Sequence, residues 1–155
     1  MAGKIDAHIQ ALGMILPAAS APVANYVPYV RSGNLVFVSG QLPMWDGQLK
    51  FPGLVGAEVS TDDAYQAARI CGLNLIAQVK AACNGDLDRV IQVVKLTGFV
   101  AGVAGFADQP KVINGASDLM VEVFRDAGRH SRAAVGAPSL PRGASVEVEA
   151  VFEVA

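Results

Sequence analysis

Charged residues, histidines and cysteines are all scarce in this chain. Only 17% of its 155 residues are charged, against about 25% in an ordinary protein. Hydrophobic residues make up 52%. This deficit of charge indicates more buried surface than a monomer of this length provides, so we expect one domain whose surface is partly covered by association with further copies.

The scarce residues and the missing patterns exclude several classes of protein. No apolar run approaches the roughly 18 residues that span a membrane, and residues 1–6 lack the apolar region of a signal peptide. The two cysteines, Cys71 and Cys83, lack metal-ligand spacing, which favours reduced thiols in a cytoplasmic protein. With only two histidines and no ligand cluster, we expect neither a metal nor a cofactor. A net charge of -2 and no basic cluster argue against nucleic acid as a partner.

Hydrophobic periodicity and turn residues divide the chain into short elements. Helices are expected over residues 4–12, 60–82 and 109–127, and strands over 35–41, 90–100, 131–136 and 145 to about 152. An extended arm is expected at 17–22, and a hairpin or irregular crossing at 43–56. We divide the chain into an N-terminal helix and arm, residues 1–22, and a single domain, residues 23–155.

The last strand shows why self-association is expected. Between Val146 and Phe152, one face carries Val, Val, Ala and Phe, while the other carries Glu, Glu and Val. The two long helices can cover one face of a sheet of this size, but not both. We therefore predict an α+β sandwich with a mixed sheet, both long helices on one face, and the other face buried against further copies.

Three stretches carry a resemblance to a known family. They are Gly33 to Pro43, which contains Ser-Gly-Gln-Leu-Pro; Val112-Ile113-Asn114; and the segment from Arg132 through Leu140-Pro141 to Ala150. With these motifs the chain resembles the Rid family of reactive intermediate deaminases, also called the YjgF-type or endoribonuclease L-PSP family, over residues 23 to 154. That resemblance implies a fold similar to bacterial chorismate mutase, as a homotrimer with ligand clefts between subunits.

The resemblance also implies an activity and its residues. Members of the family hydrolyse imines and enamines, which carry a carboxylate, to 2-keto acids and ammonia without a cofactor. By position, Arg132 would hold the substrate carboxylate, Glu147 the attacking water, and Tyr26 would close the cleft. Asn114 and Ala134 are expected beside Arg132 as ligand-binding residues, although an asparagine near a helix start also bonds local backbone.

The chain departs from the family pattern after Arg132. Typical members carry Arg-x-Cys-Val-Glu-Val, whereas this chain has Ala134 at the cysteine position and Gly136 at the glutamate position. A backbone amide at residue 134 would keep the role of the cysteine. The loss of both side chains nevertheless indicates a divergent subgroup with a different ligand.

Alternatives remain open at this point. The protein could be a non-catalytic trimer that binds a carboxylate metabolite, which the departures at residues 134 and 136 favour. Ribonuclease activity is disfavoured by the acidic pI of 5.6 and the lack of paired histidines. Chorismate mutase activity would need several cations, and only Arg132 and Arg142 are candidates. Ser39 and Gln41 are interpreted as structural, and His130 as a solvent-exposed turn residue.

Overall fold

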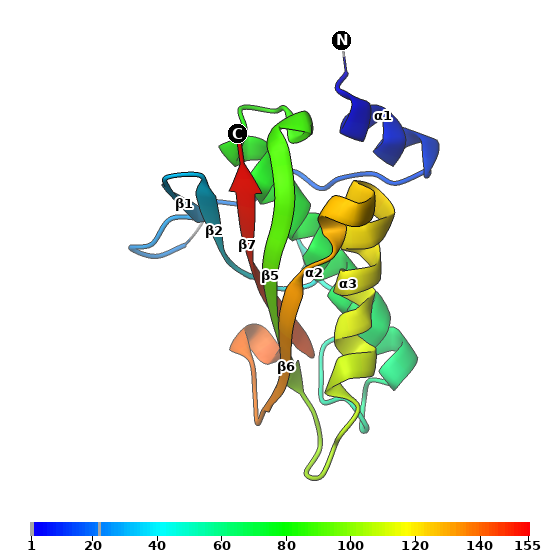
Figure 1. Ribbon diagram of the computed structural model, residues 1–155. Helices are drawn as coiled ribbons and strands as arrows, with labels where there is room; N and C mark the ends of the chain where they lie inside the picture. The colour runs from blue at the N-terminus through cyan, green and yellow to red at the C-terminus, as the bar shows by residue number, and fades with distance from the viewer. Residues whose placement is uncertain (1, 22) are drawn as a thin grey trace.

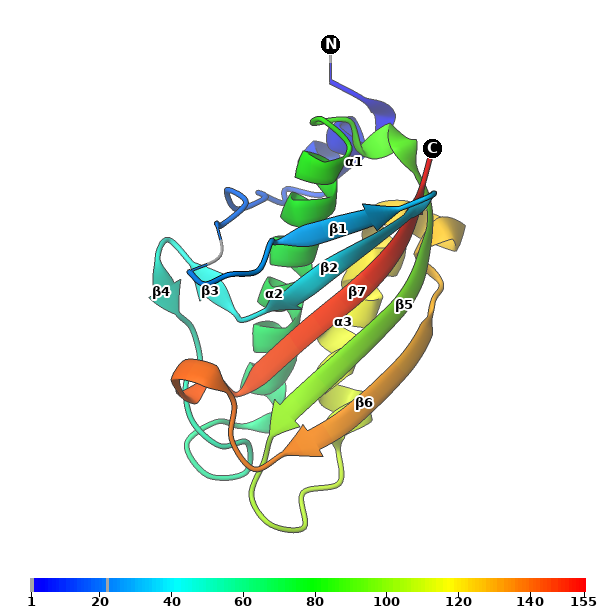
Figure 2. The ribbon, with the colours of Figure 1, turned by 90° about the vertical axis from the view of Figure 1, so that its left-hand side faces the viewer.

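The computed structural model describes residues 2–21 and 23–155 as a five-stranded sheet with helices packed on one face (Figures 1 and 2). Its helices and main strands are α1 (Lys4–Ala11), β1 (Tyr29–Ser32), β2 (Leu35–Gln41), α2 (Thr61–Ala82), β5 (Val90–Ala101), α3 (Gln109–Phe124), β6 (Ser131–Ala137) and β7 (Val146–Val154). The strand order is β1-β2-β7-β5-β6, with β5 and β6 parallel and the other neighbours antiparallel. The predicted α+β architecture is confirmed.

The two long helices cover the same face of this sheet, as predicted. Helix α2 packs on β2 and β7, and α3 packs on β5 and β6. Alternation along β7 produces this arrangement: Val146, Val148, Ala150 and Phe152 are buried beneath the helices, while Glu147 and Glu149 point to the other face. No helix within the described residues is long and apolar enough to cross a membrane.

Helix α2 begins and ends where its sequence predicts. Ser60 is the N-cap, and its Oγ accepts a hydrogen bond from the Asp63 amide at 3.0 Å. Two aspartates in the first turn complement the positive end of the helix. The chain leaves the helix after Ala82 and turns through Gly85, whose φ of +87° favours glycine.

The prediction for the second long helix was wrong at its C-terminal end. Helix α3 stops at Phe124 instead of Ala127, because Arg125 adopts a positive φ of 57°. Residues Arg125–Gly128 then form a separate 3₁₀ turn. Within α3, Gly115 allows the closest approach to α2, since a Cβ there would collide with the backbone carbonyl of Tyr65.

Two short elements complete the region between the arm and α2. Strand β1 was not predicted from the sequence; it pairs with β2 through a turn at Gly33. The predicted hairpin within residues 43–56 is present as β3 (Met44–Trp45) and β4 (Gln48–Leu49). Asp46 and Gly47 both have positive φ at its turn, which is the geometry that tight hairpins need.

The N-terminal helix packs on the domain. The Asp88 carboxylate accepts the backbone amides of Lys4 and Ile5, both at 2.8 Å, and so caps α1 from a distant part of the chain. Asp6 pairs with Lys80 at 2.7 Å. Residue Leu12, expected on the apolar face of this helix, follows its last residue and is 42% exposed. Met1 and Pro22, the predicted end of the arm, lie outside the described residues.

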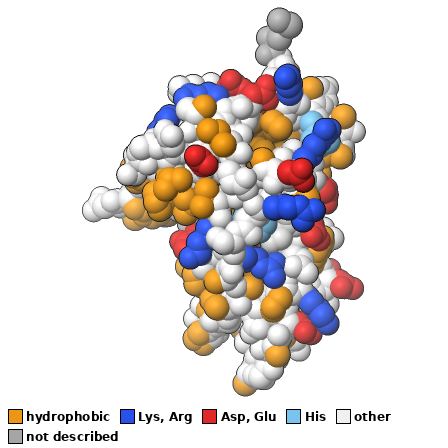
Figure 3. Space-filling model, viewed as in Figure 1, with side chains coloured by type: hydrophobic (Ala, Val, Ile, Leu, Met, Phe, Trp, Pro, Cys, Tyr) orange, Lys and Arg blue, Asp and Glu red, His pale blue; other side chains and the backbone are white. Residues whose placement is uncertain are grey.

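The sheet face opposite the helices carries exposed apolar side chains. Val30, Phe37 and Val135 are each 44–53% exposed. Figure 3 shows hydrophobic side chains gathered beside β1 and β2, on the left in that view. This surface is where the sequence places a further copy of the chain, and that association remains a prediction.

Candidate functional site

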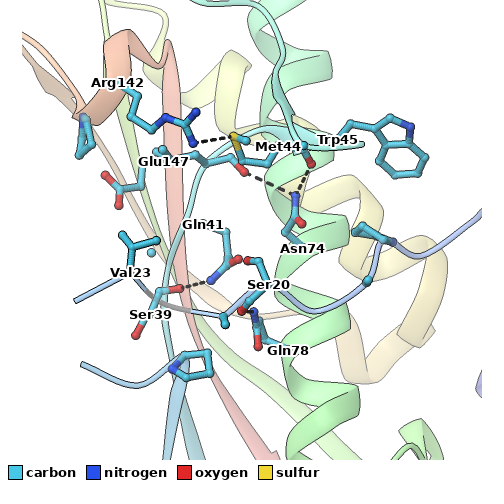
Figure 4. Close-up of a pocket in the computed structure, with 18 of the residues that line it drawn as sticks. Ser20, Val23, Ser39, Gln41, Met44, Trp45, Asn74, Gln78, Arg142 and Glu147 are labelled. Carbon is cyan, nitrogen blue, oxygen red and sulfur yellow. Dashed lines mark hydrogen bonds between the residues drawn. The ribbon is translucent and has the colours of Figure 1, made fainter. Parts of the chain in front are cut away.

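A cavity of about 660 Å³ lies where β2 ends, between α2 and the N-terminal arm. Its walls come from the arm between Ile15 and Ala21, the segment that leads into β1, the end of β2 with the hairpin that follows, the middle of α2, and the turn before β7 with Glu147. The volume falls within the roughly 300–1,000 Å³ typical of small-molecule sites. Figure 4 shows Glu147 and Arg142 on one side of the strands, and Asn74 and Gln78 on the other.

Glu147 reaches this cavity because β2 is irregular beside it. The pairing register of β2 with β7 shifts between Val38 and Gln41, which brings Gly40 against the Glu147 side chain. A Cβ built on Gly40 would lie 3.1 Å from Glu147 Cδ and would collide with Oε1. Glycine at residue 40 therefore leaves room for the carboxylate.

The Glu147 carboxylate is positioned without a stabilising partner. Burial raises its pKa above the ordinary value, and the negative charge of Glu149 raises it further. Among the described residues, no N–H or cation forms a hydrogen bond or ion pair with this carboxylate. A carboxylate whose pKa is raised is a stronger base than an ordinary glutamate, which suits it to take up a proton and release it again in general acid–base chemistry.

Tyr26 and Arg142 line the same cavity. The structure thus brings Tyr26, which precedes β1, to the same place as Glu147 on β7. Arg142 has a left-handed backbone, with φ of 61°, and its guanidinium Nη1 lies 3.7 Å from Met44 Sδ. Sequence reasoning considered Arg142 only as a secondary cation, and its place in the cavity comes from the turn before β7.

Arg132 lies elsewhere in the molecule, together with Asn114. Its Nη1 donates to Asn114 Oδ1 at 2.8 Å and to Ser117 Oγ at 3.2 Å, both on α3. Ala134, two residues further along β6, packs against the core beneath the same helix. Within the described residues, Nε and Nη2 of Arg132 donate to no partner, so they are available to a ligand.

One chain does not bring Arg132 and Glu147 together. Arg132 pairs with Leu96 on β5, and Leu96 is fully buried beneath the helices. Glu147 pairs with Phe99, three residues along the same strand. Because side chains alternate along a strand, these two registers place Arg132 and Glu147 on opposite faces of the sheet. Strand β6, which carries Arg132, is also an edge strand.

His130 supports the arrangement around Arg132 and lies outside the cavity. A carbonyl can only accept, so Nδ1 must donate to the Gly128 carbonyl, which lies 2.6 Å away. Nε2 then accepts from the Ser117 hydroxyl at 2.9 Å. Burial lowers the pKa of His130, so the ring is neutral at pH 7. The hydrogen bond to the ring orients the Ser117 oxygen toward Arg132. Because the ring is half-buried, the prediction of a solvent-exposed histidine was wrong.

Several polar residues of the cavity were missed or set aside by sequence reasoning. Ser39 and Gln41 were interpreted as structural, and Asn74 and Gln78 were not considered. The signal was present, because Asn74 and Gln78 are four residues apart in a stretch of α2 that is otherwise apolar, and side chains with that spacing share one helix face. Within residues 2–21 and 23–155, no group of three or more His, Cys, Asp or Glu residues could hold a metal ion.

Comparisons with known proteins place this architecture in one family. The model of the YjgF/chorismate mutase-like endoribonuclease family matches residues 6–153. Protein TCP17 of Trypanosoma cruzi is 49% identical over 153 residues, which cover 98% of this chain and 95% of TCP17. The crystal structure of Atu1372 from Agrobacterium tumefaciens, a protein of unknown function, is similar with a TM-score of 0.91 and 52% identity, and the match covers 97% of this chain and 92% of that one.

A relative named for an activity is more distant. The 2-iminobutanoate/2-iminopropanoate deaminase of Dermatophagoides farinae is 29% identical over 138 residues, which cover 89% of this chain and 92% of the deaminase. The match of the family model to nearly the whole sequence agrees with the resemblance that the motifs around Gly40 and Arg132 indicate. The chain belongs to the YjgF/chorismate mutase-like endoribonuclease family.

Proposed function

We propose that this protein hydrolyses 2-imino acids and their enamine tautomers to 2-keto acids and ammonia, without a cofactor. The observation that carries the proposal is the Glu147 carboxylate, which is half-buried in a cavity of substrate size, raised in pKa and unpaired among the described residues. The name of the Dermatophagoides farinae deaminase, a relative over most of the chain, supports the same chemistry.

The reaction requires the protein to position a water molecule and to supply one group that accepts and returns a proton. Glu147 accepts a proton from water as the oxygen attacks the carbon of the protonated imine. Glu147 then returns that proton to the nitrogen of the resulting carbinolamine. The C–N bond breaks as the C=O bond forms, and Glu147 takes the hydroxyl proton, which leaves with the ammonia as ammonium. Positioned acid–base help of this kind contributes roughly 10²–10⁴-fold to the rate.

The substrate carboxylate needs a cation on the face where Glu147 lies. In this proposal Arg132 from a second copy supplies it, because Arg132 and Glu147 of one chain are on opposite faces of the sheet. Asn114 and Ser117 hold one end of the guanidinium, leaving Nε and Nη2 for two charge-assisted bonds to the carboxylate. The exposed apolar face of the sheet gives the copies a surface for association, as a homotrimer with shared clefts.

The test is imine hydrolysis by the purified protein. A broad amino-acid oxidase generates 2-imino acids, and semicarbazide traps the fraction that is not hydrolysed. Wild type should lower the trapped fraction, whereas Arg132→Ala should lose substrate binding and Glu147→Gln should lose turnover while still binding. A fully active Arg132→Ala protein would remove the carboxylate anchor from the proposal.

Mixing the two inactive variants tests the shared cleft directly. In a trimer whose sites each join Arg132 of one copy to Glu147 of the next, every mixed trimer contains one intact site. Random co-assembly of equal amounts should therefore restore about a quarter of wild-type activity. No recovery, or a monomer by light scattering at micromolar concentration, would contradict the shared cleft.

A second candidate function is binding without turnover. Ala134 and Gly136, in place of the family's cysteine and glutamate, favour it. If wild type leaves the trapped fraction unchanged over a broad panel of amino acids, the protein binds carboxylate metabolites without hydrolysing imines. Thermal stabilisation by such metabolites, absent in Arg132→Ala, would then be the expected result.

A further inference from the structure

The inner end of the cavity contains three of the four polar side chains that the structure buries in its described part. Gln41, Asn74 and Gln78 are 8%, 6% and 2% exposed, and all three line the cavity. They come from two elements: Gln41 from the end of β2, and the other two from consecutive turns of α2. Figure 4 shows Gln41 pointing into the space between β2 and α2.

Hydrogen bonds fix the orientation of each amide. Gln41 Nε2 donates to the Ser39 carbonyl at 3.0 Å, and Gln78 Nε2 donates to the Ser20 carbonyl of the arm at 2.8 Å. Asn74 Nδ2 donates to the carbonyls of Met44 and Ile70 at 2.9 and 3.0 Å. Since a carbonyl can only accept, the NH₂ group of each side chain must face it, and the amide oxygen points elsewhere.

These three amide oxygens accept no hydrogen bond from the described residues. In the part of the chain that the structure describes, no N–H or O–H donates to them. The three oxygens are also accessible to solvent. In the described part of the chain, Ser145 Oγ is the one side-chain polar atom that is both inaccessible and without a partner. The accessible space beside all three side chains is the cavity, so it presents acceptors that await donors.

The surroundings limit which donor can pair with these acceptors. The arm contributes apolar walls through Ile15, Leu16 and Pro17. An ammonium group there would lose its hydration without gaining a negative partner from the neutral amides, which is unfavourable. A hydroxyl offers a single hydrogen to several acceptors. A primary carboxamide offers two N–H donors, and its oxygen can accept from the Ser20 hydroxyl, which lines the same space.

We infer that Gln41, Asn74 and Gln78 form a subsite for a carboxamide at the end of the substrate side chain. The inference rests on the proposed function for the other end of the ligand, where the imine lies beside Glu147. The preferred substrates are then 2-imino acids with a carboxamide side chain. Within this one cavity, Glu147 acts on the imine, and the three amides bind the carboxamide at the end of the substrate side chain.

The experiment compares 2-imino acids made by the oxidase from glutamine, from serine as a hydroxyl-bearing analogue, and from norleucine as an apolar analogue of similar length. For wild type, KM should be about tenfold lower with the glutamine-derived imine than with the norleucine-derived imine, at similar kcat, because the apolar tail leaves buried acceptors unpaired. Gln78→Met keeps the length and apolar volume of the side chain, so it should bring the two KM values together.

Three further variants separate recognition from damage to the fold. Gln41→Met should reduce the preference as Gln78→Met does. Gln66→Met changes an exposed glutamine on the same helix and should leave the preference intact. Gln78→Glu removes the bond to the arm but keeps acceptor oxygens, so it should retain part of the preference. If Gln78→Glu lost the preference as completely as Gln78→Met, the preference would depend on the bond to the arm and not on the acceptor oxygens. That result would overturn the inference.

A binding measurement keeps this inference separate from the proposed function. Trp45, the only tryptophan of the chain, lines the cavity and reports occupancy by fluorescence. If no imine is hydrolysed, the proposed function fails, and titration with glutamine against norleucine decides the subsite. Tighter binding of glutamine, lost in Gln78→Met, supports the carboxamide subsite. Equal binding of both, or turnover with equal KM values, overturns it.

Discussion

Replacement of Gly40 by alanine should disable the site while leaving the fold intact. The added Cβ would lie 3.1 and 3.2 Å from Cδ and Cγ of Glu147, below the 3.4 Å at which ordinary contact begins, and would collide with Oε1. Gly40 does not have a left-handed backbone, so alanine causes no backbone strain. The half-buried Glu147 side chain can rotate away, so we expect a stability loss below about 1 kcal/mol.

The loss of activity follows from the size of that rotation. To relieve the collision, the carboxylate must move by on the order of 1 Å, and a misplacement of that size costs about 10²-fold in rate. We therefore expect kcat for imine hydrolysis by Gly40→Ala to fall about a hundredfold, measured with the semicarbazide trap, at nearly unchanged Tm.

Two comparisons make this prediction refutable. Gly136→Ala is a matched control, because the Cβ there meets the movable end of the Gln109 side chain at 3.2 Å and the Val100 carbonyl at an ordinary 3.9 Å. This variant should keep activity within about threefold. In a Glu147→Gln background, Gly40→Ala should have little further effect, because both changes act on one group. Full activity of Gly40→Ala, or an equal loss in both backgrounds, would refute the reasoning.

Three further predictions concern stability. The pKa of Asp88 is lowered from 3.8, chiefly because its carboxylate accepts hydrogen bonds from backbone amides of α1. This stabilisation of α1 docking is therefore present above pH 3.8 and is lost as pH falls through the lower folded-state pKa. Amide exchange should show α1 losing protection in acid, and Asp88→Asn should lack this pH dependence. Gly115→Ala should destabilise by about 3 kcal/mol in urea unfolding, because its Cβ meets the backbone of α2 instead of a movable side chain; a loss below about 0.5 kcal/mol would show that the helices separate easily. The pKa of Glu147 is raised from 4.5, so its ionisation destabilises the folded state. The Tm of wild type should equal that of Glu147→Gln below pH 4.5 and should become lower than that of the variant as pH rises through the higher folded-state pKa. A wild type more stable than the variant at pH 7 would contradict this.

The parts of the fold that could be predicted are those with strong local signals. Helix α2 has a serine cap and a glycine stop, and β7 alternates cleanly between buried and exposed positions. Strand β1 has no such signal, because three of its four residues are exposed and it lies at the edge of the sheet. The end of α3 depends on a left-handed Arg125, which the residue type does not favour.

The candidate site could be predicted only in part, for a similar reason. The resemblance to the family pointed to Glu147 and Tyr26, and both line one cavity in the structure. The opposite faces of Arg132 and Glu147 follow from the registers in which β6 and β7 pair with β5, which chain order does not reveal. The amide-lined end was missed because a buried glutamine such as Gln78 becomes meaningful only once the arm lies over it.

The arm gives the molecule a way to change its ligand without changing its framework. Residues 15–21 wall the cavity but belong to no helix or strand, and a side-chain hydrogen bond from Gln78 fastens them to α2. Substitutions at Ile15, Pro17 and Ala18, which line the cavity and lie outside the core cluster, would reshape the binding space while the packing between sheet and helices stays the same. Exchanging these residues between relatives is therefore a practical route to new specificity.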